Sequence, residues 1–186
     1  AIYVCFALIS LFYLLKRNYT LSFAFLSIAF CFKMQAIFFI PIFIITYIIW
    51  QDFSIVYFLW IPGMYIVTGI PAILCGKGIV DTYGVYFKQL GSYNGMTFGA
   101  PNIYVFGLNN YQALSEPAIL FTCTILIFTT AYVYKYRNVI NNEKIIYLSG
   151  WIIWSCYMFL PAMHERYDYA AILLISVYMI CYNRKM

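Results

Sequence analysis

The sequence predicts an all-α protein, a polytopic transmembrane helical bundle with about seven hydrophobic segments, some short or broken, and a long outer loop. Three observations predict this class. Hydrophobic residues make up 65% of the 186 residues, whereas charged residues make up only 9%. The mean hydropathy of +0.84 is too high for a soluble domain, which could not keep so much apolar surface from water. The apolar runs also lack the strict alternation of an outer-membrane barrel strand.

Seven apolar runs are expected to form the helices, and each one ends at polar or charged residues. In chain order the runs cover, approximately, residues 1–15, 21–32, 36–50, 54–74, 117–133, 145–160 and 169–181. Several contain fewer than the ~20 apolar residues needed to cross a bilayer upright. Flanking residues must therefore extend these helices, or some runs are re-entrant. Because the sequence shows no repeat or low-complexity tail, residues 1–186 are predicted to form a single transmembrane domain.

The stretch from residue 20 to residue 50 is the ambiguous part of this order. As one helix it would be ~46 Å long at 1.5 Å per residue, far more than a ~30 Å hydrocarbon core requires. It would also place Lys33 and Gln35 near the middle of the membrane. A break at Lys33 instead gives two shorter segments and moves the lysine to an interface.

The distribution of basic residues supports this break, because cytoplasmic segments carry an excess of Lys and Arg. With the break, seven of the 11 basic residues share one face, which we predict to be cytoplasmic. They are Lys16, Arg17, Lys135, Arg137, Lys144, Arg184 and Lys185. The opposite, outer face then carries His164 and the remaining four basic residues, Lys33, Lys77, Lys88 and Arg166.

A 37-residue stretch, 76–112, lies on the outer face in this topology and contains seven of the 10 glycines. Long ordered loops of this kind are more often functional than passive connections. Within it, Asn102 follows Pro101 and either caps a short helix or binds a sugar hydroxyl, and capping is the favoured interpretation. Glu116 is expected to be a charge at the start of the helix that begins at Pro117.

The last two apolar runs flank the polar segment His164-Glu165-Arg166-Tyr167. Arg166 offers a planar fork of donors to a phosphate, and the imidazole can donate to another anionic oxygen. Glu165 could hold either cation in place. The alternative is an interfacial anchor, in which arginine and tyrosine lie at headgroup level. Composition leaves both interpretations open.

Lys33 and Gln35 interrupt an apolar stretch, and here too there are two interpretations. Lys33 is either a lysine that extends its ammonium group to the interface at a helix break, or a point charge for a lipid-linked phosphate at the outer leaflet. On spacing alone the first is favoured. The predicted topology places Lys33 on the same face as His164, which favours the second.

Several kinds of chemistry lack support in the sequence. Asp81, Glu165 and Asp168 are the outer carboxylates that could act as a general base, but no pair has diagnostic spacing. There is no phosphate-binding glycine loop and no Ser-His-Asp arrangement. One histidine and six cysteines without a CxxC spacing predict no metal site. The net charge of +5 follows from topology and does not indicate nucleic-acid binding.

Three segments together resemble landmarks of bacterial membrane glycosyltransferases of the GT-C superfamily, in the subgroup similar to the GPI-anchor mannosyltransferases. The segments are Phe32-Lys33-Met34-Gln35-Ala36 with Ile40-Pro41, then Ala100-Pro101-Asn102-Ile103-Tyr104, then Phe159-Leu160-Pro161-Ala162-Met163-His164-Glu165-Arg166-Tyr167. The resemblance covers nearly the whole chain and corresponds to the C-terminal part of the family's longer architecture. It implies a multi-pass protein of the bacterial plasma (inner) membrane whose active face is extracytoplasmic.

The resemblance implies inverting transfer of a sugar, mannose by default, from a polyprenyl-phosphate donor to a glycan or lipid-linked acceptor. No tightly bound cofactor and no metal ion are expected. Lys33, His164 and Arg166 would neutralise the donor phosphate as it leaves. The expected donor-phosphate and substrate-binding residues are Lys33, Gln35, Asn102, His164, Glu165, Arg166 and Tyr167. The catalytic carboxylate is expected upstream of Ala1, so this chain is expected to be inactive alone.

Three other functions stay open at this point. A transporter or flippase of lipid-linked glycans would use the same cations without chemistry, and such proteins often contain repeated halves. A polymerase or ligase of lipid-linked glycans would also have a large outer loop. Those enzymes are expected to carry several outer arginines, whereas Arg166 is the one outer arginine of this topology. A structural membrane subunit would leave the break at Lys33 and the long loop unexplained.

Overall fold

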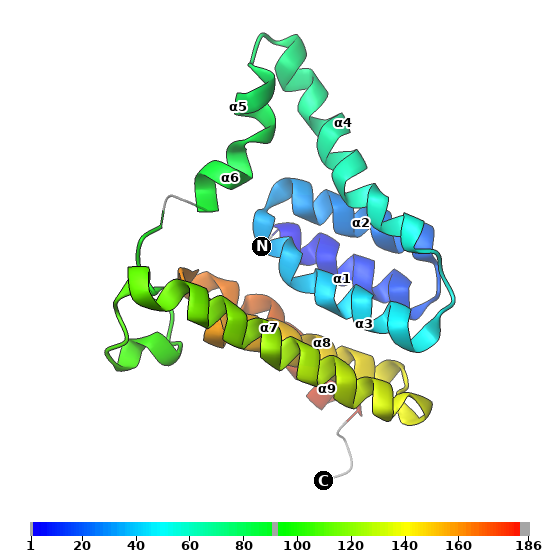
Figure 1. The fold of residues 1–186 in the computed structure, drawn as a ribbon. Helices are drawn as coiled ribbons and strands as arrows, with labels where there is room; N and C mark the ends of the chain where they lie inside the picture. The colour runs from blue at the N-terminus through cyan, green and yellow to red at the C-terminus, as the bar shows by residue number, and fades with distance from the viewer. Residues whose placement is uncertain (1, 91–92, 183–186) are drawn as a thin grey trace. The chain divides into compact units, whose positions relative to one another are not determined.

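The described part of the chain, residues 2–90 and 93–182 of a computed structural model, is nearly all helical (Figure 1). Helices account for 80% of the structure, which confirms the all-α class. The chain divides into two compact units. The first comprises Ala1–Ile37 and Asp52–Tyr93, and the second comprises Phe38–Gln51 and Asn94–Met186. That residues 1–186 form one transmembrane domain stays a prediction.

Among its described residues, the first unit contains five α-helices and a 3-10 helix. They are α1 (Ile2–Leu15), α2 (Tyr19–Phe32), the 3-10 helix Ile55–Leu59, α4 (Trp60–Leu74), α5 (Ile79–Tyr83) and α6 (Val85–Leu90). Helices α1 and α2 lie side by side, and α4 packs against α2 (Figure 1). Two buried serines join the first pair. The hydroxyl of Ser10 donates to the carbonyl of Ser22 at 2.7 Å, and the hydroxyl of Ser22 donates to the carbonyl of Ser10 at 2.8 Å. Small residues at such contacts let two helix backbones approach closely.

The predicted break at Lys33 is confirmed. Helix α2 ends at Phe32, and Lys33 is extended, with φ −159° and ψ 132°. The chain continues in the 3-10 helix Met34–Phe39, through which the division between the two units runs. Apolar residues alone would have allowed the helix to continue, so the polar interruption marks the break.

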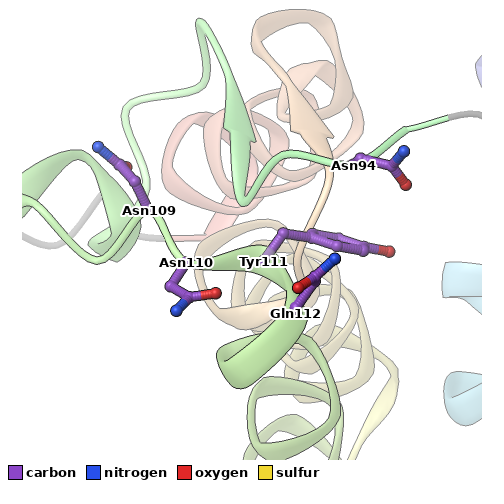
Figure 2. Close-up of a pocket in the computed structure, with 5 residues that line it drawn as sticks. All are labelled: Asn94, Asn109, Asn110, Tyr111 and Gln112. Carbon is purple, nitrogen blue, oxygen red and sulfur yellow. The ribbon is translucent and has the colours of Figure 1, made fainter.

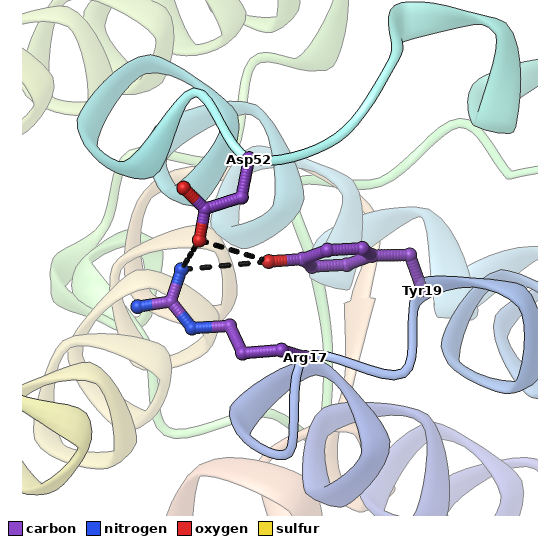
Figure 3. A network of polar contacts seen from close by, with 3 residues as sticks. All are labelled: Arg17, Tyr19 and Asp52. Carbon is purple, nitrogen blue, oxygen red and sulfur yellow. Dashed lines mark hydrogen bonds and ion pairs between the residues drawn. The ribbon is translucent and has the colours of Figure 1, made fainter.

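Within the first unit, an ion pair brings together the turn after α1 and the start of the segment before α4. The Arg17 guanidinium contacts the Asp52 carboxylate, and the Tyr19 hydroxyl lies 3.2 Å from the same carboxylate oxygen (Figure 3). A single straight helix over residues 20–50 would separate these groups by its full length. The contact therefore confirms that the chain reverses direction between Tyr19 and Asp52.

As far as residue 182, where the described part ends, the second unit contains four α-helices, two short strands and three 3-10 helices. The α-helices are α3 (Ile40–Trp50), α7 (Tyr111–Lys135), α8 (Asn142–Phe159) and α9 (Tyr169–Tyr182). The strands are β1 (Thr97–Phe98) and β2 (Met163–His164), and the 3-10 helices are Ile103–Phe106, Arg137–Val139 and Glu165–Tyr167. Helix α8 packs against α3, α7 and α9, and α3 also packs against α7 (Figure 1).

The predicted start of the fifth helix at Pro117 is wrong, because α7 begins at Tyr111. The Asn110 side chain caps the helix by accepting from the Ala113 amide at 3.2 Å, which satisfies one of the orphan donors of the first turn. Pro117 lies inside the helix. Glu116 is consequently in the second turn of the helix and not at its start, where the sequence had indicated it.

Two helical stretches among the described residues are long and apolar enough to cross a membrane. They are Ile55–Leu74, with 20 residues, and Tyr111–Lys135, with 25 residues. These two stretches indicate association with a membrane. The apolar helices Ile2–Leu15, Tyr19–Phe32 and Met34–Trp50 are shorter. Arg184 and Lys185, which entered the charge count, lie outside the described residues.

The predicted outer loop, 76–112, is largely structured, and it is divided between the two units. Its first part forms α5 and α6 of the first unit. The side chain of Tyr86 in α6 donates to the Phe30 carbonyl at 2.5 Å and so fixes α6 to the end of α2. Its second part forms β1 and a 3-10 helix of the second unit, and these build the candidate site.

Candidate functional site

The candidate site is formed by two segments of the second unit, 94–104 and 162–168, which we call the loop pair. Strand β1 pairs with β2 in parallel, so that Thr97 is opposite Met163 and Phe98 is opposite His164. The amide of Ala162 donates to the Met96 carbonyl at 3.0 Å and extends the pairing by one bond. Backbone hydrogen bonds therefore fix the position of the polar segment that begins at His164.

Two residues with positive φ shape the loop pair. Gly99 has φ +74° and forms a bridge with His164, and Ala162 has φ +58°. Glycine adopts this conformation without a steric penalty, whereas alanine does not. A Cβ atom on Gly99 would lie 3.2 Å from Oε2 of Glu165, so the absence of a side chain leaves room for that carboxylate.

Asn102 and Tyr104 anchor the first segment. The Oδ1 atom of Asn102 accepts from the Tyr104 amide at 3.2 Å and caps the 3-10 helix Ile103–Phe106, which confirms the capping role. The Tyr104 hydroxyl donates to the Phe159 carbonyl at 2.5 Å. Phe159 is the last residue of α8, where carbonyl groups lack partners within the helix. The loop therefore supplies a hydrogen-bond donor to a carbonyl group at the end of α8. Burial raises the pKa of the Tyr104 hydroxyl.

The loop pair lies on an apolar cluster. Ala100, Tyr157, Met163 and Tyr167 form its buried part, and Phe38, Met158 and Leu160 pack against it. Tyr167 is only 8% exposed, so its ring holds the polar segment onto α8. The hydroxyl of Tyr157 is buried and has no hydrogen-bond partner among the described residues. The amide nitrogen Nδ2 of Asn102 is also buried and also lacks a hydrogen-bond partner within residues 2–90 and 93–182.

His164, Glu165 and Arg166 form the polar surface of the loop pair. The His164 ring is half-buried, stacks on Phe98 with ring centroids 5.1 Å apart, and meets the Tyr167 ring edge-on at 5.3 Å. These two contacts fix the plane of the imidazole. Glu165 and Arg166 are exposed. The backbone is thus rigid at a position where a guanidinium group is accessible to an anion.

A polar pocket of about 490 Å³ opens beside the loop pair (Figure 2). Its lining comes from the segment before β1 and from the start of α7, and comprises Asn94, Asn109, Asn110, Tyr111 and Gln112. A carboxamide both donates and accepts hydrogen bonds without carrying a charge. Four carboxamides beside an aromatic ring form a surface suited to a molecule rich in hydroxyl groups. The sequence reasoning missed this pocket, and the pair Asn109-Asn110 before an apolar run was the signal that could have indicated it.

Lys33 and Gln35 belong to the first unit, whereas Asn102 and the His164–Tyr167 segment belong to the second. The Lys33 ammonium group lies over the Tyr3 ring of α1, 5.6 Å from its centroid. Gln35 is half-buried in the 3-10 helix that follows. That Lys33 and Arg166 meet one phosphate stays a prediction.

One of the three candidate general bases, Asp81, lies in an ion pair with Lys88. Asp81 accepts a hydrogen bond from the Lys88 ammonium group at 2.6 Å, and this bond lowers the pKa of the Asp81 carboxyl group. A lowered pKa makes a carboxylate a weaker base, which argues against Asp81 in that role. Across residues 2–90 and 93–182, no three His, Cys, Asp or Glu side chains are grouped as metal ligands would be.

Comparison of the chain with protein-family models, with curated proteins and with solved structures finds no match. A proposal of function therefore depends on the sequence and on the geometry of the loop pair and the polar pocket.

Proposed function

We propose that the protein is an integral-membrane glycosyltransferase of the GT-C type, with about seven spans in the bacterial plasma membrane. It transfers a sugar, mannose by default, from a polyprenyl-phosphate donor to a glycan or lipid-linked acceptor on the extracytoplasmic side. The observation that carries the proposal is the combination of a rigid segment with an exposed arginine and an adjoining pocket of carboxamides. In a lipid-linked sugar, the phosphate would bind the arginine and the sugar hydroxyl groups would bind the carboxamides.

The position of this combination along α7 also supports the proposal. Helix α7 has 25 residues, about 37 Å at ~1.5 Å per residue, which exceeds a ~30 Å hydrocarbon core. Gln112 of the polar pocket lies in its first turn, and Lys135 is its last residue. The polar site and the basic α7–α8 turn thus lie at opposite ends of one helix, as the positive-inside rule requires of outer and cytoplasmic faces.

In the proposed reaction, an acceptor hydroxyl oxygen bonds to the anomeric carbon as the bond from that carbon to the donor phosphate oxygen breaks. The hydroxyl proton passes to a carboxylate, which is expected upstream of Ala1. The guanidinium of Arg166 neutralises the charge that develops on the leaving phosphate, the imidazole of His164 donates a hydrogen bond to it, and Lys33 adds a second cation. Asn102 acts through the loop that it caps.

The test measures sugar transfer from a radiolabelled polyprenyl-phosphate sugar in membranes that contain the complete gene product. We expect Arg166→Ala to lower the transfer rate by about 10²-fold or more, as removal of one charge-stabilising donor does elsewhere. We expect Arg166→Lys to restore part of it, because a single ammonium cannot replace the planar fork. The matched control is Lys88→Ala, which removes another exposed cation.

Two results would contradict the proposal. Wild-type transfer in both Arg166→Ala and Lys33→Ala, with unchanged membrane insertion, would remove the phosphate-binding role of these cations. Movement of the lipid-linked sugar across vesicles without any glycosidic product would instead identify a flippase.

A further inference from the structure

A second cavity lies between α7 and α8, toward the end where the two helices are joined. It has a volume of about 520 Å³. Four aromatic side chains line it, Phe128, Tyr132, Tyr147 and Trp151, and Lys144 is the charged residue of the lining. The indole nitrogen of Trp151 donates to the Thr129 hydroxyl at 3.4 Å, so this polar group has a partner within the unit. We call this cavity the aromatic groove.

The turn beside the aromatic groove is basic. Between residues 135 and 144 it carries Lys135, Arg137 and Lys144 against one acid, Glu143. The Lys144 ammonium group donates to the Val139 carbonyl at 2.7 Å, and an ammonium group has three donors. The Arg137 guanidinium lies over the Tyr134 ring at 4.7 Å. The groove therefore combines an apolar floor with one lining cation, Lys144, and the turn beside it adds the positive charge of Lys135 and Arg137.

We propose that the aromatic groove binds an anionic phospholipid. One acyl chain lies along the aromatic floor, and the headgroup phosphate meets Lys144 in the positive field of the basic turn that carries Arg137. Charge complementarity selects this occupant: basic pockets between helices at the cytoplasmic ends of membrane proteins suit anionic headgroups, and each basic residue near the surface contributes about 1 kcal/mol. Tryptophan and tyrosine are also the side chains that favour the boundary between headgroups and hydrocarbon. The proposal depends on α7 lying in a membrane and not on glycosyl transfer.

The test uses tryptophan fluorescence in vesicles. All tryptophans of the complete protein except Trp151 are replaced by phenylalanine, which within this chain means Trp50→Phe, Trp60→Phe and Trp154→Phe, so that Trp151 is the reporter. The complete protein is placed in phosphatidylcholine vesicles that contain either brominated phosphatidylglycerol or brominated phosphatidylcholine at equal mole fraction. We expect the brominated anionic lipid to associate with Trp151 about 5- to 30-fold more strongly, the equivalent of one to two basic residues.

The variant Lys144→Gln with Arg137→Gln is expected to lower this preference to near unity, whereas Lys144→Arg retains it. Lys88→Gln is the matched control for loss of an exposed cation elsewhere. A second variant keeps Trp60 as its reporter tryptophan. Quenching of Trp60, at the start of α4, measures the lipid around a different helix on the face predicted to be cytoplasmic. Equal quenching of Trp151 by the two lipids overturns the proposal. An equal preference at Trp60 and Trp151 also overturns it, because the membrane surface as a whole would then concentrate the lipid.

Discussion

The substitution Tyr104→Phe tests whether the loop pair is held in place by the end of α8. The Tyr104 side chain is 6% exposed, and its hydroxyl donates to the Phe159 carbonyl at 2.5 Å. Phenylalanine fills the same volume, so no cavity forms. The change removes one hydrogen bond and leaves a helix-end carbonyl without its donor, at a cost of about 1–2 kcal/mol.

This cost applies to opening of the loop pair. A change of about 1–2 kcal/mol corresponds to a factor of roughly 5–30 in the opening equilibrium. The reporter is the amide of Ala162, which donates to the Met96 carbonyl across the loop pair at 3.0 Å. We expect its hydrogen-exchange rate, measured by mass spectrometry on the peptide that contains it, to rise by the same factor of roughly 5–30.

The control is Tyr169→Phe, which removes a hydroxyl from a side chain that is 58% exposed at the start of α9. Its effect on exchange at Ala162 is expected to be negligible, because surface substitutions change stability by less than about 0.5 kcal/mol. If Tyr104→Phe raises the exchange rate by less than about two-fold, the hydroxyl does not anchor the loop and the reasoning is refuted.

Three further predictions concern the loop pair and the ion pair of Lys88 with Asp81. Gly99→Ala and Gly107→Ala should each cost about 1–2 kcal/mol, because both positions have positive φ (+74° and +96°). Only the first should also lower sugar transfer, since its Cβ meets Glu165, and equal transfer in the two variants would contradict this. The raised pKa of Tyr104 means that the opened state ionises first, so protection at the loop pair should be complete below pH ~10 and lost as pH rises through the folded value. Tyr104→Phe should abolish that dependence. Finally, Lys88→Met should raise the lowered pKa of Asp81 to its ordinary range in an NMR titration, and an unchanged value would exclude Lys88 as the cause.

Helix lengths and charges predicted the local features of the fold. The break at Lys33 followed from comparing a length of ~46 Å with a bilayer core of ~30 Å, and α2 does end at Phe32, directly before Lys33. The start of α7 was missed because Pro117 resembled a first-turn proline, whereas the Asn110 side chain caps the helix earlier. Both residue types are typical of helix starts, and only the hydrogen bond of Asn110 decides between them.

The site was predicted in part. Asn102 was correctly interpreted as a cap, since capping depends on residues within the same turn. The pairing of β1 with β2 could not be predicted, because two-residue strands carry no periodicity and are brought together by α7 and α8. The polar pocket was missed for the same reason: Asn94 joins Gln112 only through the folded loop.

Whether Lys33 and Arg166 act on one phosphate is the step on which the proposed chemistry depends, and a double-mutant cycle decides it. In the proposed reaction Lys33 of the first unit and Arg166 of the second act on the same donor phosphate. If both cations stabilise the same leaving phosphate, Lys33→Ala in an Arg166→Ala background should cost less than it does alone, with a coupling of about 0.5–3 kcal/mol in the transfer rate. Additive losses would instead mean that the two cations act at separate places, and Lys33 would then be a residue of the helix break alone.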